Sequence, residues 1–410
     1  MGYTHSSPYG ENEPTVKERM KLFTAVDSFK GSISSQKIRT VTEKAIKAHA
    51  MQGADLTCDC VSVGDGGEGT AEAFTEGLSR KIIRVPVTGK TGRKKTAKLY
   101  AVGNKIYLDC CSACGISAEN RKGDALISFT SYGVGELILA AMKEDACEEV
   151  VVGLGGSGTV DGGAGMLAAL GATFYDRMGR EVGYLPSEID RVFRVDLSPA
   201  RAKITKKLTV LCDTQAPLIG EGGAVALFAE QKGATAAGKR YLERTLGIFS
   251  AAADKNLSEL LANNGDVTEP NSTAFLPCGG AAGGLGWALV YLLGGERKSG
   301  LSALFEERGY EERLQNADAV LCGEGLLDGT SFTGKVVGKI AELCEKYGKP
   351  LYLICGDAEP FLPLPGVVSG VYKLTDITPV IAECICRAQE FYENRLLALL
   401  NDIAPLPAKE

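Results

Sequence analysis

Short apolar runs alternate with longer amphipathic stretches along most of the chain, which is the pattern of a parallel sheet covered by helices. Most of these runs end in a polar or glycine-rich loop that leads into a predicted helix. In open α/β sheets, ligands bind beyond the carboxyl ends of the strands, so we expect the functional residues in these loops. The predicted strands are 21–28, 56–63, 148–155, 208–214, 317–325 and 350–357.

The stretch from about 81 to 118 has a different pattern. Its turn sequences "TGKTG" and "VGNK" separate short alternating runs, which are typical of antiparallel hairpins. This predicts an inserted α/β domain with a mixed sheet over residues 81–280, since "CGGAAGGLGWALVYLL" opens a helix near 280. The first domain is then discontinuous, with residues 21–80 and 281–405, and 1–20 form a polar disordered tail.

A chain of 410 residues fits two domains, and its composition excludes several classes of function. The net charge is −6 and no block of basic residues occurs, so no nucleic-acid partner is expected. No run reaches the roughly 18 apolar residues of a membrane span, and no secretory signal opens the chain. Thirteen scattered cysteines predict reduced thiols in a cytoplasmic protein. An apolar oligomer interface would look like core, so a homo-oligomer stays possible.

The densest glycine cluster is "GLGGSGTVDGGAG", residues 153–165, in which Asp161 is the only ionisable side chain. So much glycine suggests a tight turn or a ligand held against the backbone. The run also fits a dinucleotide fingerprint, but further glycines interrupt the helix that this motif needs. Near the end, Gly329, Gly334 and Lys335 fit part of a P-loop, although Val336 replaces the hydroxyl residue.

Loops that combine glycine with carboxylates and lysines favour phosphoryl transfer. Backbone amides and ammonium groups stabilise phosphoryl oxygens, while carboxylates hold Mg²⁺ and orient the attacking hydroxyl. The chain has only two histidines, so the base is expected to be an aspartate. Asp213 is our choice, since it follows a hydrophobic strand closely. The carboxylates in these loops are Asp27, Asp65, Glu68, Asp161, Asp213, Glu324 and Asp328, with Lys30 and Lys335 nearby.

Seven of these segments together resemble the glycerate kinases of the bacterial type, which are unrelated to P-loop kinases. The segments are "VDSFKGSIS", "VGDGGEGT", "TSYGVGELI", "GLGGSGTVDGGAGMLAALGATF", "FAEQKGAT", "GGAAGGLG" and "GEGLLDG" followed by "GK". The resemblance runs from about residue 20 to 390. It implies a Rossmann-like domain with an inserted α/β domain and an active site in the cleft between them. It also implies ATP and Mg²⁺ as cofactors and a small hydroxy acid, glycerate or a relative, as substrate.

From the motif loops we assign expected roles. Catalysis is expected of Asp213, Lys30 and Asp161, and metal binding of Asp161, Glu324 and Asp328. Substrate binding is expected of Asp27, Ser28, Lys30, Asp65 and Glu68. Nucleotide phosphates are expected to contact Gly155, Gly156, Ser157, Gly283, Gly284 and Lys335.

The chain departs from the family pattern at five motif positions, each of which has lost a polar group. The family usually has Asn at Val160, Asn at Ala216, Thr at Val134, Arg at Leu326 and Gln at Thr330. These losses put glycerate itself in question and leave both of its hydroxyls as candidate acceptors. A non-catalytic paralogue that binds nucleotide or metabolite is therefore the alternative to a kinase, and a dinucleotide oxidoreductase is a third interpretation.

Overall fold

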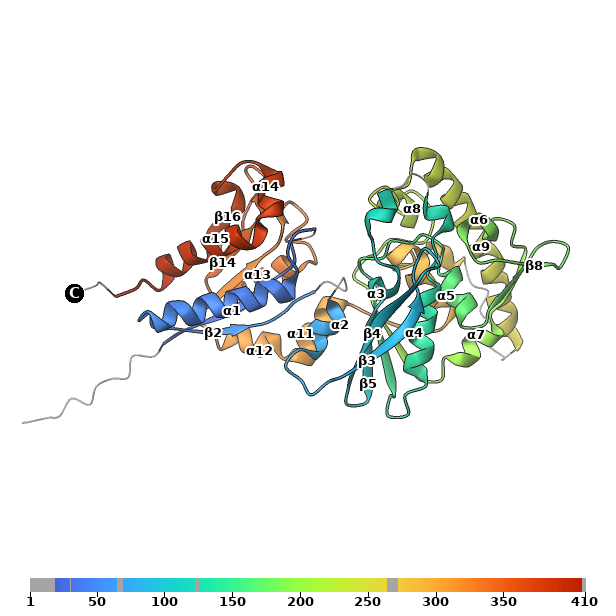
Figure 1. The fold of residues 1–410 in the computed structure, drawn as a ribbon, viewed down its shortest axis with the longest axis horizontal. Coiled ribbons are helices and arrows are strands. Elements are labelled where there is room, and N and C mark those ends of the chain that lie inside the picture. Colours follow the sequence, from blue (N-terminus) through green and yellow to red (C-terminus); the bar gives the residue numbers. More distant parts are fainter. Residues whose placement is uncertain (1–18, 30, 65–68, 122–124, 264–271, 408–410) are drawn as a thin grey trace, which may run out of the picture.

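The structure, a computed structural model, describes residues 19–29, 31–64, 69–121, 125–263 and 272–407. Figure 1 shows two lobes, each built around one β-sheet. The sheet of the first lobe is fully parallel, with the order β16-β14-β12-β1-β2. Its strands are β1 Met20–Val26, β2 Leu56–Cys60, β12 Ala319–Gly323, β14 Leu351–Cys355 and β16 Val368–Lys373. The predicted Rossmann-like parallel sheet is thus confirmed.

The sheet of the second lobe is mixed, as predicted, with the order β11-β10-β6-β5-β4-β3. The strands from β11 to β5 are parallel, whereas β3, β4 and β5 form the antiparallel hairpins. Its strands are β3 Lys81–Thr88, β4 Lys94–Val102, β5 Lys105–Asp109, β6 Glu149–Gly153, β10 Lys207–Leu211 and β11 Glu296–Lys298. This sheet takes its last strand, β11, from beyond the boundary expected at residue 280.

Two small sheets complete the strands. The two-stranded sheet, parallel, joins β13 and β15, and the three-stranded sheet has the order β8-β7-β9. They consist of β13 Leu326–Leu327, β15 Asp357–Ala358, β7 Thr173–Tyr175, β8 Glu181–Val182 and β9 Arg194–Asp196.

Alternation along β1 explains how helices cover both faces of the first sheet. Leu22 faces a core shared with α1 and α15, whereas its neighbour Phe23 faces the opposite core with α12 and α13. Helix α1 begins where the Ser34 side chain accepts a hydrogen bond from Lys37 N. The helices of this lobe are α1 Ser35–Met51, α12 Tyr310–Gln315, α13 Val336–Tyr347, α14 Ile381–Cys386 and α15 Ala388–Ile403.

Eight helices belong to the second lobe, and two others lie between the lobes in Figure 1. The first group is α3 Cys111–Cys114, α4 Tyr132–Met142, α5 Ala164–Ala169, α6 Pro186–Ile189, α7 Ser198–Lys203, α8 Ala224–Phe228, α9 Ala236–Asn263 and α10 Leu285–Trp287. The helices in between are α2 Thr70–Thr75 and α11 Gly300–Arg308. Side chains from α2, α11 and both sheets share one hydrophobic core, which joins the lobes.

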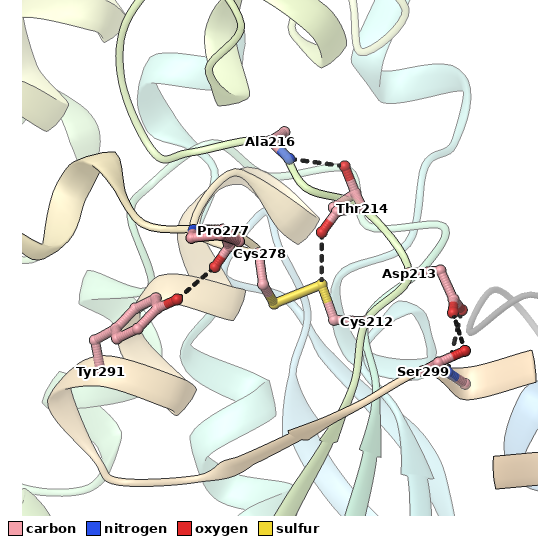
Figure 2. The surroundings of a disulfide bond; sticks show 9 residues. Cys212, Asp213, Thr214, Ala216, Pro277, Cys278, Tyr291 and Ser299 are labelled. Carbon is pink, nitrogen blue, oxygen red and sulfur yellow. Dashed lines mark hydrogen bonds between the residues drawn. A yellow bond between two sulfur atoms is a disulfide. The ribbon is translucent and has the colours of Figure 1, made fainter. Parts of the chain in front are cut away.

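Two cysteines depart from the expectation that all thiols are reduced. Cys212, directly after β10, forms a disulfide with Cys278, and their Cα atoms lie 6.2 Å apart (Figure 2). The partners are 66 residues apart in the chain, so only the folded arrangement brings them together. The other cysteines are not part of this disulfide and keep their thiol groups.

A membrane-spanning helix is not found anywhere in the described part of the chain, since none there combines the necessary length and apolar character.

Candidate active site

Two predicted carboxylates meet at the carboxyl edge of the five-stranded sheet. Val26 of β1 lies beside Gly323 of β12, and Asp27 N donates to Gly323 O at 2.9 Å. Asp27 and Glu324 therefore leave neighbouring strands at the same level. The Asp27 carboxylate also accepts a hydrogen bond from Ser28 N at 2.6 Å, which holds the start of the loop that follows.

Lys335 joins this edge from the start of α13. Its Nζ lies 3.8 Å from Glu324 Oε2 and 3.7 Å from Asp328 Oδ1. Asp328 Oδ1 also accepts hydrogen bonds from the side chain and the backbone of Thr330, at 2.6 and 2.8 Å. The Thr330 hydroxyl, with a smaller contribution from Lys335, lowers the pKa of the Asp328 carboxyl, which favours its anionic form.

One buried oxygen at this edge lacks a partner in the described part of the chain. Glu324 Oε1 is enclosed by the protein yet makes no hydrogen bond to any described residue, although buried polar atoms normally have one. Magnesium prefers oxygen ligands, and one or two carboxylates suffice because the ion keeps several waters. The donor set of Glu324 and Asp328 therefore fits Mg²⁺. No cluster of three or more histidine, cysteine or acidic side chains suited to a metal occurs among the described residues.

Asp161 occupies a different environment from the one expected of a metal ligand. It is fully buried, and its carboxylate accepts hydrogen bonds from Ser131 N, Ser131 Oγ, Gly163 N and Gly165 N at 2.7 to 3.3 Å. Burial raises the pKa of this carboxyl, and the four hydrogen bonds oppose that shift. These hydrogen bonds tie the glycine run to Ser131 at the start of α4.

Asp213 lies at the carboxyl edge of the six-stranded sheet, as its position after β10 predicted. Because β10 pairs with β11, the carboxylate reaches the residues after β11, and it accepts from Ser299 Oγ at 2.6 Å and Gly300 N at 3.2 Å (Figure 2). Asp213 is exposed, and these bonds orient it from the start of α11.

The glycine run divides into an exposed turn and a buried segment. Gly156 is exposed in the turn after β6, with φ of +73°, and Gly155 is half-buried. Ser157, the next residue, is buried and accepts a hydrogen bond from Lys232 Nζ at 3.1 Å. Only the turn at Gly155 and Gly156 offers backbone to a ligand.

Gly283 and Gly284 pack against the glycine run itself. A Cβ added at Gly283 would lie 2.0 Å from Thr159 O, and one at Gly284 would lie 2.3 Å from the Cα of Gly162. Gly162 N donates to Gly283 O at 3.0 Å. These two glycines, expected to contact a nucleotide, instead allow two backbone segments to touch.

Lys30, Asp65 and Glu68, which were expected to bind substrate, lie outside the described residues. The chain segments next to them line a cavity of about 410 Å³ with residues from both lobes, among them Ser34, Val63 and Gly69 of the first lobe and Tyr100 of β4.

Asp109 and Lys232 were not among the residues predicted from the sequence. The Asp109 carboxylate, at the end of β5, accepts from Gly69 N and Ala71 N and so caps α2 from the other lobe. The sequence does place a carboxylate, Asp109, directly after an alternating run, and this pattern could have marked it as a candidate. Lys232 lies in the motif "FAEQKGAT", but nothing in that motif predicted its burial.

The departures from the family pattern fall in two environments. Val134 and Val160 are completely buried in the apolar core of the second lobe, and Ala216 is buried as well. Leu326, by contrast, is 48% exposed beside Glu324, and Thr330 supports Asp328. The changes that face the site are therefore those at 326 and 330.

Comparisons with known proteins agree over nearly the whole chain. The model of the glycerate kinase family matches residues 22–399. A glycerate 2-kinase of Escherichia coli K12 is 35% identical over 344 residues, which cover 82% of this chain and 85% of that protein. A glycerate kinase of Bacillus subtilis 168 is 34% identical over 341 residues, with the same coverage.

A solved structure agrees as well. The crystal structure named for a glycerate kinase 2 from Salmonella typhimurium LT2 superposes with a TM-score of 0.69 at 29% identity. The match covers 93% of this chain and 98% of the chain in that crystal structure.

Proposed function

The chain belongs to the glycerate kinase family and is thus a kinase, and on this premise we propose that it uses ATP to phosphorylate glycerate or a closely related hydroxy acid. The products are phosphoglycerate, or the corresponding phosphorylated acid, and ADP. The observation that carries the proposal is the group of Glu324, Asp328 and Lys335 beside Asp27 at the edge of the parallel sheet. Two carboxylates and an ammonium at a strand end suit a phosphate with its counter-ion.

In this proposal, each group of residues has one task. Lys335 and the exposed turn at Gly155 and Gly156 bind phosphate oxygens, because an ammonium and backbone amides stabilise negative charge. Asp27 and Ser28, together with Lys30, Asp65 and Glu68, bind the hydroxy acid. Glu324 and Asp328 hold Mg²⁺, which when bound neutralises charge on the β- and γ-phosphates.

Asp213 accepts the proton of the substrate hydroxyl. The hydroxyl oxygen forms a bond to the γ-phosphorus, the bond from that phosphorus to the β–γ bridging oxygen breaks, and ADP leaves. The hydrogen bonds from Ser299 Oγ and Gly300 N orient the carboxylate, and orientation is the larger part of what a base in phosphoryl transfer contributes.

A coupled ADP-release assay tests the proposal, with a panel of hydroxy acids and sugar acids and with and without Mg²⁺. We expect Mg²⁺-dependent turnover of glycerate or a close relative. If no acid of the panel is turned over while nucleotide still binds, the chain is a non-catalytic binder.

Glu324→Gln should raise the Mg²⁺ concentration needed for half-maximal activity by about 10–100-fold, the range found when support of a metal site is removed. The amide keeps the shape of the side chain but removes the charge that attracts the ion. Titration of Mg²⁺ in the ADP-release assay measures the change. Glu359→Gln is the matched control, because Glu359 lies in the same region and, among the described residues, its side chain accepts a backbone hydrogen bond from Gly329 N and no other. Equal Mg²⁺ dependence in both variants would argue against a metal at Glu324.

Gly156→Val should raise the KM for ATP by about tenfold or more, because a branched side chain would occupy the space where a phosphate approaches the turn. Steady-state kinetics with varied ATP measure it. The left-handed backbone at Gly156 also strains valine, so the melting temperature must be recorded. A variant that loses stability without a change in KM would make the glycine structural.

A further inference from the structure

Lys232 is a lysine whose ammonium group is buried inside the second lobe. It lies between α8 and α9, and only 3% of its surface is exposed. Lysine is almost never fully buried unless its charge is paired, so this position calls for an explanation.

Lys232 holds the glycine run directly after the exposed turn. Its Nζ donates to Ser157 Oγ at 3.1 Å and to Thr159 O at 2.9 Å. Asn120 supports the same segment from the other side, since its Nδ2 donates to Gly158 O at 2.9 Å and to Lys232 O at 3.1 Å. The ammonium is therefore fixed one residue behind the turn formed by Gly155 and Gly156.

Both acceptors of this ammonium are neutral, and no carboxylate forms an ion pair with it among the described residues. The charged or titratable groups that face it are Asp161 from the glycine run and Cys114 from α3. Lys90 approaches from the β3–β4 turn through Asn120 Oδ1, at 2.6 Å. Asp161 uses its oxygens for hydrogen bonds to Ser131, Gly163 and Gly165, so it offsets the buried charge only from a distance.

We propose that Lys232 is a positioning residue for the nucleotide, which places a buried positive charge behind the turn at Gly155 and Gly156 so that the turn binds a phosphate group. This inference rests on the proposed function. It means that Lys232 supplies a positive charge to a glycine turn that has no charged side chain of its own. Lys232 acts through Ser157 and the backbone, and it does not touch the ligand. A charge in a protein interior is screened less than one in water, so the ammonium that is bonded to Ser157 also attracts a phosphate at the adjoining turn.

A consequence is that nucleotide binding and protonation of Lys232 are linked. Burial lowers the pKa of Lys232 to about 8, and the nearby Cys114 and Asp161 side chains raise it only in part. A phosphate anion at the turn favours the charged ammonium and raises its pKa in the complex. The free protein then takes up a proton when nucleotide binds, and affinity falls as pH rises through about 8. The terminal phosphate of ADP has a last pKa of about 6, so ADP itself does not titrate in this range.

Calorimetric titration of the full chain with ADP and Mg²⁺ tests the inference. Titrations at about pH 8.5 in two buffers with different ionisation heats give the number of protons taken up. For the wild type we expect an uptake of a few tenths of a proton per ADP, and a similar uptake with inorganic tripolyphosphate that is saturated with Mg²⁺ beforehand so that its own last proton is already lost. Lys232→Met should abolish the uptake and weaken ADP binding at about pH 7 by about 5–10-fold, since one pKa unit corresponds to tenfold.

Two further variants separate positioning from stability. Lys239→Met is the matched control, because Lys239 lies nearby on α9 and pairs with Glu230 at 2.5 Å, and it should bind like the wild type. Lys232→Arg keeps a permanent charge, so it should bind without proton uptake and with an affinity that no longer falls above pH ~8. A merely structural lysine would change the melting temperature but not these pH profiles.

Each outcome decides between the alternatives. Absence of proton uptake in the wild type, or equal uptake in Lys232→Met, overturns the inference, and normal turnover in the ADP-release assay would then leave the proposed function intact. If neither Lys232 variant folds, the wild-type uptake with tripolyphosphate decides. If ADP and tripolyphosphate do not bind at all, the proposed function falls and the inference falls with it.

Discussion

Replacing Asp213 with asparagine is expected to lower kcat by about 10²–10⁴-fold, the usual contribution of a general base. Asparagine keeps the size of the side chain, and its amide oxygen can still accept the hydrogen bond from Ser299 Oγ. It cannot take up the proton of the attacking hydroxyl. The KM for ATP should change little, because the proposed role of Asp213 is to accept the proton of the substrate hydroxyl and not to bind the phosphates. ADP-release kinetics at saturating substrate measure the effect.

Ser299→Ala is the control for this variant. Ser299 caps α11 and donates to Asp213, so its loss should cost about 1 kcal/mol of stability. If Asp213 only capped the helix, both variants would lower the melting temperature alike and both would keep kcat. Normal turnover by Asp213→Asn would remove the base role from this residue.

Gly283→Ala is expected to destabilise the second lobe by about 4 kcal/mol or more, which is exceptional for a single methyl group. The added Cβ would lie 2.0 Å from Thr159 O and 2.8 Å from the Cα of Val160, so two backbone segments would have to separate. The φ of +68° at Gly283 adds strain for any residue with a side chain. Chemical denaturation, followed by the fluorescence of the buried Trp287, measures the loss.

Gly247→Ala provides the comparison. Gly247 lies within α9, and no atom is within 4 Å of its ideal Cβ, so alanine should be neutral or stabilise the helix by about 0.5–1 kcal/mol. If Gly283→Ala unfolds at the same denaturant concentration as the wild type, the close contact between the two glycine segments does not contribute to stability. Their role would then have to be sought in ligand binding.

For the glycine run, the sequence predicted close approach to the backbone but not which group approaches it. Dense glycine correctly indicated a place where something approaches the backbone closely. At most of the run that partner is protein, because a Cβ at Gly165 would lie 2.1 Å from Thr130 Oγ1 and the segment at Gly283 fills the space beside Thr159. Only the turn at Gly156 is open. Composition cannot distinguish a ligand from another chain segment, since both require the absence of a side chain.

The carboxylates show the same division. Asp27 and Glu324 follow the neighbouring strands β1 and β12 of the first sheet, and Asp213 follows β10 of the second. Parallel strands of one sheet end at the same edge, so these strand-end positions followed from the order of the runs. Asp161 also follows a strand, since β6 ends at Gly153, yet its carboxylate is buried and accepts four hydrogen bonds. Its role depends on Ser131, which lies 30 residues earlier and meets it only in the folded chain.

The sequence by itself determined the parallel and mixed sheets, the strand-end position of the site and the family, because these depend on local periodicity and on collinear motifs. The tertiary structure alone decided the Cys212–Cys278 pairing, the enclosure of Glu324 Oε1 and the burial of Lys232 against Ser157. It also placed β11 in the second sheet, beyond the expected domain boundary. Each of these features arises where segments far apart in the chain meet, and its free energy depends on desolvation and packing that no local pattern encodes.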